Sequence, residues 1–519
     1  MANYHPNSTD YVHSFEPNTE DLRKAMDYNE YGQPIIRVVT SQGTLNSGQQ
    51  TGANDFFGEA LSIPLVPYVQ LNSYEGVQAR DTQVYTSGGG SVSDANDVIT
   101  VSCSSTVGSY GVYRSERFVP YKPGQTNTAR LLTKFDTPQS GTQQRVGVAN
   151  QENGYFVGYN GTDLQFLHTY GGKAEIRTVD VTGTASADQT LTVTLNSQAY
   201  TVAILEDDTA NIVAQKISMA ISGTVWLSNQ VDNTVRFLAG GLGPRSGTYS
   251  LTSTGNITGT FTQRVAGVTQ TDEWSDITSL PSWFDPSYWN HWQFQYSWSG
   301  INVYLLNKIT NNWFLVLRHG SEVQTNLPIT HPAFKLTTVV YNVGGSTGVS
   351  LEVASMAGFE EGAAALTTFT HGGGVTKTSL ASGTYHHIMS IQNPFVGDSN
   401  NWRINFRTIR FLDLTVAAQV NDPVELYIMY NGPLASPDVY DFISYPNRLY
   451  QASTVNADFD MTYDTPVCAL TLGLTGSQAQ FDLSEYNLVI PPGTHMSLVA
   501  YSTASIQKIT ISGVWGTVG

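Results

Sequence analysis

Carboxylates are the residues of this chain most able to do chemistry, because cleavage of a glycosidic bond needs two of them about 5–10 Å apart. Sandwich-type glycan hydrolases commonly carry them on one strand as Glu-x-Asp-x-x-Glu, and the sequence has no such string. Glu352 stands alone, while Glu360 and Glu361 are adjacent and would face opposite sides of a strand. These patterns predict that the chain is not an enzyme.

Oxygen-bearing side chains that suit a metal ion recur at one place. Asn456, Asp458 and Asp460 alternate, which puts all of them on one face of a strand, and Asp464 follows. Because Ca²⁺ takes about six to eight oxygen ligands, these residues are a calcium candidate. The string lacks the glycine and the distal glutamate of an EF-hand loop, so we interpret it as a solvated acidic edge and predict no metal site, with calcium binding as the alternative. No cofactor is predicted.

Aromatic residues form the most unusual cluster in the chain. Six of the nine tryptophans lie between Trp274 and Trp313. Exposed aromatic rings in loops stack on sugar rings or fill partner pockets. The candidate ligand-binding residues are those of one proline-containing loop: Trp283, Phe284, Tyr288 and Trp289. The alternative is that these rings fill the joint between two domains.

The elements that must position these candidates are short alternating runs of aromatic and β-branched residues, each ended by Gly, Asn or Pro. They cover residues 111–178 and 272–362. Asn160-Gly161, between two such runs, predicts a tight hairpin turn. The two stretches together predict one antiparallel sandwich of jelly-roll or concanavalin-like type, which residues 179–271 interrupt.

The interrupting segment, residues 179–271, differs in pattern from its surroundings. It begins with a hairpin predicted to turn at Asn196-Ser197, and an apolar stripe at helical spacing follows over residues 209–221. These features predict a small inserted α+β module. Residues 363–519 alternate again with few helical signals, which predicts a second β-sandwich. The fold class is therefore mainly β, with tandem sandwiches.

The first 110 residues carry weaker patterns. Residues 1–50 are predicted to be a docking arm and linker, because a short helix over Glu20–Met26 precedes a tether rich in Gly, Gln and Ser. A helix packed on its own domain is the alternative for that arm. Residues 51–110 are predicted to form a β-rich connecting region.

Composition limits the classes of partner. Of the 519 residues only 13% are charged, and the net charge is −17, which argues against a nucleic-acid surface because phosphate neutralisation needs clustered Lys and Arg. Cys103 and Cys468 are too far apart in the sequence to suggest a disulfide framework. The N-terminus has no signal-peptide pattern and no run is long enough for a membrane span, so synthesis in the cytoplasm is expected.

Several strings resemble a family of virion structural proteins from tailed phages and large DNA viruses. The strings that carry this resemblance are residues 155–162, 168–177, 244–251 and 354–362. The similarity covers roughly residues 110–362, and its motifs are turns and core strands, so it transfers no catalytic residue. It implies a component of a virus particle without saying which component.

Together these features predict a non-enzymatic virion structural protein: a capsid, vertex, fibre or tail component made in the host cytoplasm. Homo-oligomers are expected, with a trimer preferred by analogy with viral fibres, together with contacts to other virion proteins and a possible host-surface glycan. Neither nucleic acid nor a membrane is an expected partner. The alternative functions are a carbohydrate-binding receptor adhesin, with the aromatic loop as its site, and a glycan depolymerase whose carboxylates come from separate strands.

Overall fold

A computed structural model describes most of the chain from residue 66 onward, together with three short strands before it. The described residues are 12–13, 22–28, 34–40, 66–78, 81–121, 126–150, 152–221, 226–320, 331–360, 369–396, 402, 404–432, 434–435, 438, 440–444, 451–461, 466–472, 478–483 and 488–518. Almost every element is a β-strand, and all the named strand pairs are antiparallel, which confirms the mainly β fold class with sandwich layers.

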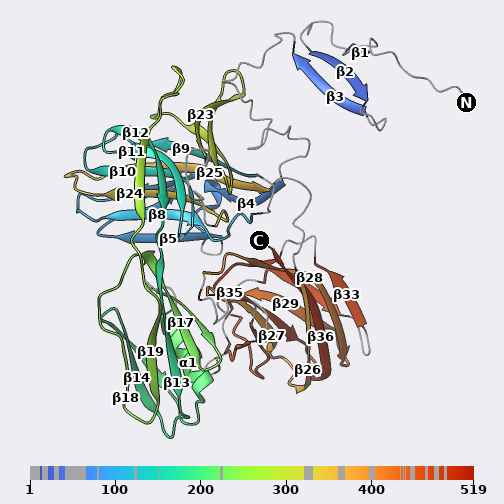
Figure 1. The fold of residues 1–519 in the computed structure, drawn as a ribbon. Coiled ribbons are helices and arrows are strands. Elements are labelled where there is room, and N and C mark those ends of the chain that lie inside the picture. The colour runs from blue at the N-terminus through green and yellow to red at the C-terminus, as the bar shows by residue number, and fades with distance from the viewer. Residues whose placement is uncertain are drawn as a thin grey trace, which may run out of the picture.

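The first sandwich consists of two sheets that face each other across a common core (Figure 1). The seven-stranded sheet contains, in spatial order, β20 (Thr271–Asp276), β12 (Asp163–Tyr170), β11 (Gly154–Asn160), β10 (Thr142–Ala149), β24 (Lys335–Asn342), β8 (Tyr110–Ser115) and β5 (Thr82–Ser87). The eight-stranded sheet contains β23 (Asn312–Gly320), β22 (Gly300–Asn307), β21 (Asn290–Ser297), β9 (Asn127–Phe135), β25 (Ser350–Glu360), β7 (Val98–Ser102) and β6 (Ser91–Ala95), with β4 (Val66–Asn72) also pairing with β25. A 3-10 turn, η1 (Ser73–Glu75), follows β4.

The core of this sandwich follows from the two-residue period of its strands. On β9, Ala129, Leu131 and Phe135 are buried, and on β21 the large rings of Trp292 and Phe294 are fully buried. Burial of such rings is the main favourable term in folding, about 25 cal/mol for each Å² of apolar surface removed from water. The opposite faces of the same strands carry the polar residues considered below.

Both sheets combine strands from before and after residues 179–271. β12 and β20 are direct neighbours, with Tyr170 paired to Thr271, and β9 lies between β21 and β25. The turn between β11 and β12 contains Gly161 at φ 66°, in the left-handed region that glycine tolerates. Because Asn160 pairs with Asp163, the two turn residues are Gly161 and Thr162, one position later than the predicted Asn160-Gly161. Strands β4 to β7, within the predicted β-rich connecting region of residues 51–110, belong to this sandwich.

The inserted module contains two small sheets and the single α-helix of the described residues. Its sheets are β16 (Trp226–Val231), β17 (Thr234–Leu242), β13 (Ala174–Thr182) and β19 (Thr258–Val265), and β15 (Gln198–Ile204), β14 (Gln189–Leu195) and β18 (Ser250–Ser253). Helix α1 (Ala210–Ile221) buries Val213, Ile217 and Ile221 in the module core, as the apolar stripe predicts. Asn196 and Ser197 have φ of 50° and 67°, which confirms a primed turn there. Since β13 starts at Ala174, the module begins before residue 179.

The C-terminal region has two further sheets around its own core. One contains β26 (Phe369–Leu380), β36 (Ile506–Val518), β28 (Thr408–Gln419) and β33 (Gln478–Asp482), with β34 (Val489–Ile490) on β28. The other contains β30 (Ile443–Ser444), β31 (Gln451–Ser453), β27 (His386–Asn393), β35 (Thr494–Tyr501), β29 (Val424–Tyr430) and β32 (Cys468–Leu472). Figure 1 shows this region in orange and red beside the green module.

The N-terminal helix expected over Glu20–Met26 is wrong. β2 (Leu22–Tyr28) pairs along its whole length with β3 (Pro34–Thr40), and β1 (Val12–His13) pairs with the first part of β2. Both cysteines are free thiols. No helix among the described residues is long and apolar enough to cross a membrane.

Candidate functional site

The outer face of the eight-stranded sheet carries the best-defined group of polar side chains next to the aromatic loop. Arg130 and Lys134 alternate on β9 with residues that enter the core, so they lie on the face opposite the core. The antiparallel register of β25 pairs Glu352 with Lys134. Residues that the sequence separates by more than two hundred positions thus share one surface.

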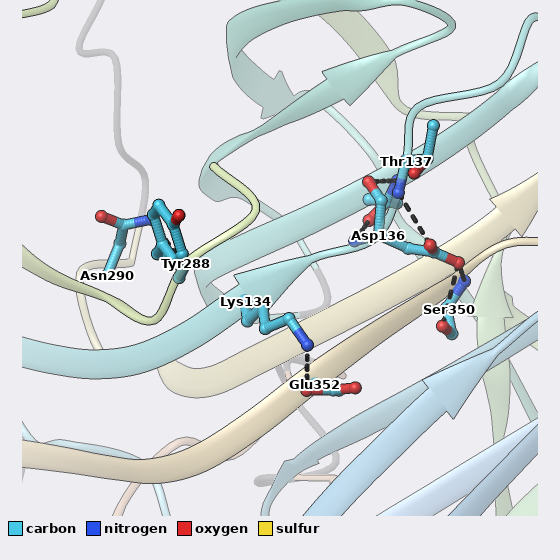
Figure 2. A network of polar contacts seen from close by, with 8 residues as sticks. Lys134, Asp136, Thr137, Tyr288, Asn290, Ser350 and Glu352 are labelled. Atoms are coloured by element: carbon cyan, nitrogen blue, oxygen red, sulfur yellow. Dashed lines mark hydrogen bonds and ion pairs between the residues drawn. The ribbon is translucent and has the colours of Figure 1, made fainter. Parts of the chain in front are cut away.

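Six residues form this surface, which we call the β9–β25 patch, and two contacts fix their arrangement. The six are Lys134, Asp136, Thr137, Ser287, Ser350 and Glu352. Lys134 Nζ lies 3.0 Å from Glu352 Oε2, and about a third of each side chain is exposed. Oδ2 of Asp136 accepts hydrogen bonds from both N–H and Oγ–H of Ser350, each at 3.1 Å. Figure 2 shows both contacts side by side, with Thr137 donating its N–H to Asp136.

The loop that precedes β21 is fixed against the end of β9. Phe135 N–H donates to the carbonyl of Pro286 at 3.2 Å, and the side-chain amide of Asn290 donates to the carbonyls of Asp285 and Tyr288. Ser287 donates both its hydroxyl and its N–H to Asp285, which lowers the pKa of that carboxyl. These bonds hold the loop against the end of β9, so that its Ser287 borders the β9–β25 patch, and Figure 2 includes Tyr288 and Asn290 of the same segment.

The candidate aromatic residues of this loop divide into two kinds. The ring of Phe284 packs edge-on against Trp292 at 5.6 Å and contacts the sandwich core, which is the joint-filling role. Trp289 is half-buried, and its carbonyl accepts a hydrogen bond from Lys308. Tyr288 is 68% exposed and Trp283 is 39% exposed. Ligand binding by this loop stays a prediction, and its exposed rings are the two that a ligand could reach.

The middle of the same face is a layer of rings around one guanidinium. Arg130 donates to Gln293 Oε1 at 2.8 Å, and its charge lies 5.2 Å from the ring of Trp313 and 5.3 Å from that of Phe359. Burial lowers the pKa of Arg130. Cation–π contacts of this kind contribute about 0.5–2 kcal/mol each, so this layer stabilises the face that carries the patch.

The chemistry available at the patch is hydrogen bonding and ion pairing, with two carboxyl groups near each other. Asp136 binds Ser350, which precedes Glu352 by two positions on the same face of β25, so both carboxyl groups lie on one surface. Paired carboxylates of glycoside hydrolases lie about 5–10 Å apart. Sequence reasoning allowed for carboxylates from separate strands but did not identify this pair, because only the pairing of β9 with β25 brings the two residues to one surface.

The proposed calcium ligands lie in the C-terminal region, far along the chain from the patch. Asn456 and Asp458 are exposed, whereas the residues between and after them, Ala457 and Phe459, are buried. Asp458 Oδ1 lies 3.0 Å from His386 Nδ1. Asp464 lies outside the described residues. In the part of the chain that the structure describes, no group of three or more His, Cys, Asp and Glu could hold a metal ion.

One further pattern escaped the sequence reasoning. Residues 344–348 match Gly-x-Ser-x-Gly, the string around the nucleophile of many serine hydrolases. That string needs a sharp strand-to-helix turn, whereas these residues connect β24 to β25. Asn342 accepts hydrogen bonds from the N–H groups of Gly344 and Gly345, so the segment is a structural turn.

Comparisons with known proteins concern the fold. No family model matches the sequence, and no curated protein matches it. Among solved structures, a glycosyl hydrolase family 16 protein from Mycobacterium smegmatis has 9% identity and a TM-score of 0.27, and the match covers 56% of this chain and 100% of that one. A β-1,3-glucanase from Mycobacterium marinum has 11% identity and a TM-score of 0.26, over 57% of this chain and 99% of that one.

A third solved structure gives a similar result. The exoplasmic/lumenal domain of VIP36 has 10% identity and a TM-score of 0.25, over 58% of this chain and 95% of that domain. The expectation that this chain is not an enzyme is wrong, because glycosyl hydrolases are among the structures it resembles. At these identities and TM-scores the similarity is one of fold, and it assigns no substrate and no residue role to this chain.

Proposed function

We propose that the first sandwich binds a glycan on the β9–β25 patch, with the loop that contains Tyr288 as the side of the site. The observation that carries this proposal is the position of Lys134, Asp136 and Glu352 on one partly exposed surface that Ser287, the loop residue before the exposed Tyr288, also borders. This corresponds to the adhesin alternative from the sequence, with the site extended from the loop onto the sheet.

The residue types of the patch match the surface of a sugar. Sugar hydroxyls both donate and accept hydrogen bonds, and the patch offers an ammonium donor, carboxylate acceptors and the hydroxyls of Ser287, Ser350 and Thr137. The apolar face of a pyranose packs on an aromatic ring, and Tyr288 offers such a ring with a polar tip. Because hydrogen bonds already fix the loop, binding costs little ordering entropy.

A glycan array probed with the full chain tests this proposal. We expect a restricted set of glycans to bind, and Tyr288→Ala and Glu352→Gln to weaken that binding at least about tenfold, since a lost hydrogen bond to a charged group costs about 1.5–3 kcal/mol. Tyr74→Ala is the matched control, because Tyr74 has the same 68% exposure on η1. Binding that survives both patch variants would contradict the assignment of the site.

Glycan hydrolysis is a second candidate function, favoured by the two carboxyl groups of Asp136 and Glu352 on one surface. Incubation of the chain with polysaccharides that bind on the array, followed by a reducing-end assay, tests it. Asp136→Asn and Glu352→Gln should each remove activity while Tyr288→Ala lowers it through binding. If no reducing ends appear with any bound polysaccharide, the site is a binding site only.

The location in a virus particle remains a proposal that rests on the sequence resemblance alone. The mainly β fold and the low charge content are compatible with a particle component. Mass spectrometry of purified particles would test the location, and light scattering the expected trimer. A compact monomer at every concentration would contradict oligomerisation through these sheets.

A further inference from the structure

A cavity of about 400 Å³ lies between the first sandwich and the inserted module, away from the β9–β25 patch. Tyr85 on β5 with Tyr110 and Arg114 on β8 lines one side, which is the seven-stranded sheet. Asn196, Trp226 and Arg245 line the module side. Its volume falls within the range of small-molecule pockets, about 300–1,000 Å³, and it mixes aromatic rings with a few polar groups, as such pockets do.

Arg114 is held in a fixed orientation by neutral groups. Its Nε–H donates to Gln83 Oε1 at 2.8 Å, and Nη2 donates to the hydroxyl of Tyr85 at 3.1 Å. Its guanidinium also lies 4.8 Å from the centre of the Tyr85 ring. Among the described residues no carboxylate pairs with Arg114, so its charge is not neutralised and several of its N–H donors remain free.

Arg245 brings a second positive charge to the cavity. Its backbone N–H donates to the buried carboxylate of Glu175 at 2.7 Å, and the other oxygen of that carboxylate pairs with Arg177 at 2.5 Å. Glu175 is therefore neutralised by Arg177, and the guanidinium of Arg245 has no ion pair within the described chain. In contrast, four other arginines each pair with a carboxylate: Arg117, Arg145, Arg177 and Arg264.

Arg114 and Arg245 both line this cavity without an acidic partner among the described residues, and none of the described residues that line it is Asp or Glu. Guanidinium groups that are oriented in advance recognise carboxylates through paired hydrogen bonds. We infer that this cavity binds a sugar residue that carries a carboxylate, with Arg114 and Arg245 contacting the anion and the tyrosine rings bordering the sugar ring. The sugar class rests on the proposed function, whereas the preference for an anion rests on the cavity alone.

Calorimetric titration of the full chain tests this inference with defined probes. Methyl glucuronide represents an internal uronic acid, N-acetylneuraminic acid represents a terminal acidic sugar, and methyl glucoside is the neutral control. We expect at least one acidic sugar to bind and the neutral sugar to bind at least about tenfold more weakly. Added salt should lower the affinity for the acidic sugar, because dissolved ions screen the attraction between its carboxylate and the arginines. Which of the two acids binds shows whether the cavity takes an internal uronic acid or a terminal acidic sugar.

Variants assign the binding to the cavity. Arg245→Gln is the deciding variant, because the guanidinium of Arg245 holds no element of the described chain together. This variant should lower the affinity for the acidic sugar at least about tenfold. Arg318→Gln, at an exposed arginine on β23 of the other sheet, is the matched control and should change nothing. Unchanged affinity in Arg245→Gln, equal binding of acid and neutral sugars, or no binding of either acid would each overturn the inference.

The two proposals can fail separately. Tyr288→Ala should leave binding of the acidic monosaccharide unchanged, and Arg245→Gln should leave unchanged any array signal that depends on Tyr288. If neither acid binds while that array signal persists, the cavity inference is wrong and the proposed function stands. If an acid binds through Arg245 while Tyr288→Ala changes no array signal, the cavity stands and the β9–β25 patch is not the glycan site.

Discussion

Nε2 of His387 lies 2.8 Å from Oγ of Ser390, in a contact that has the residue types of a base and its nucleophile. Both residues are fully buried, and Ser390 in turn bonds Ser497 at 2.6 Å while His387 Nδ1 bonds the carbonyl of Val455. A nucleophile without access to substrate cannot react, so this network stabilises the C-terminal sandwich instead. Tyr440 extends it through a hydrogen bond to Ser497.

This network predicts acid sensitivity of the C-terminal sandwich. Burial lowers the pKa of His387 to about 4, and that of nearby His495 also to about 4, against an ordinary value near 6.5. The unfolded chain therefore binds more protons than the folded chain between pH 6.5 and 4, so stability falls as pH falls through that window. Urea denaturation followed by tryptophan fluorescence at several pH values checks this.

Replacement of one histidine gives the control for the acid prediction. His387→Gln keeps a hydrogen-bonding side chain but does not titrate, so it should flatten part of the pH dependence while lowering stability at neutral pH. A pH profile with the same slope in the variant and in the native chain would contradict the role given to His387.

The aromatic loop yields a prediction on stability. Phe284→Ala removes a ring that packs on Trp292 and should lower the free energy of unfolding by about 1–3 kcal/mol. Trp283→Ala removes the exposed ring next to Phe284 and should change the free energy of unfolding by no more than about 0.5 kcal/mol. Chemical denaturation of both variants checks the difference, and equal losses would mean that exposure does not separate the two roles.

The contact between the module and the C-terminal region predicts the effect of one tryptophan. Trp402 lies 5.3 Å from the guanidinium of Arg236 and 4.7 Å from that of Arg264, and Arg236 also donates to the carbonyl of Val396. Trp402→Ala should therefore loosen this contact by about 0.5–2 kcal/mol for each lost cation–π pair. Limited proteolysis should then separate the C-terminal region faster, and an unchanged cleavage rate would contradict this.

The insertion can be removed at a defined point. Tyr170 and Thr271 are direct cross-strand partners at the end of the β12–β20 pair. Replacing residues 171–270 with Asn-Gly should close that pair as a hairpin and leave the first sandwich folded. Calorimetry should show a cooperative melt, and the acidic-sugar binding assigned to the cavity should disappear. Loss of any cooperative transition would mean that the sandwich needs the module.

The fold was largely predictable where local signals decide it. The primed turn at Asn196 and Ser197 and the apolar stripe of α1 depend on neighbours in the sequence, and the structure has both. The helix prediction for the segment from Leu22 failed because this segment pairs with β3 instead, and the local sequence pattern does not encode that pairing. The contact between Lys134 and Glu352 spans 218 positions, so only the sheet register could reveal it.

The interruption of the first sandwich also fixes an order of events during synthesis. Arg130 on β9 pairs with Ala357 on β25, so the central strand pair of that sandwich cannot form until more than two hundred further residues have been made. The module lies wholly within that interval and its own residues form its main core, so it can fold while the ribosome is still at work, before its contacts with the C-terminal region exist. Until then the apolar faces of β9 to β12 have no completed partner sheet. We expect chaperone dependence to concentrate on nascent chains of intermediate length.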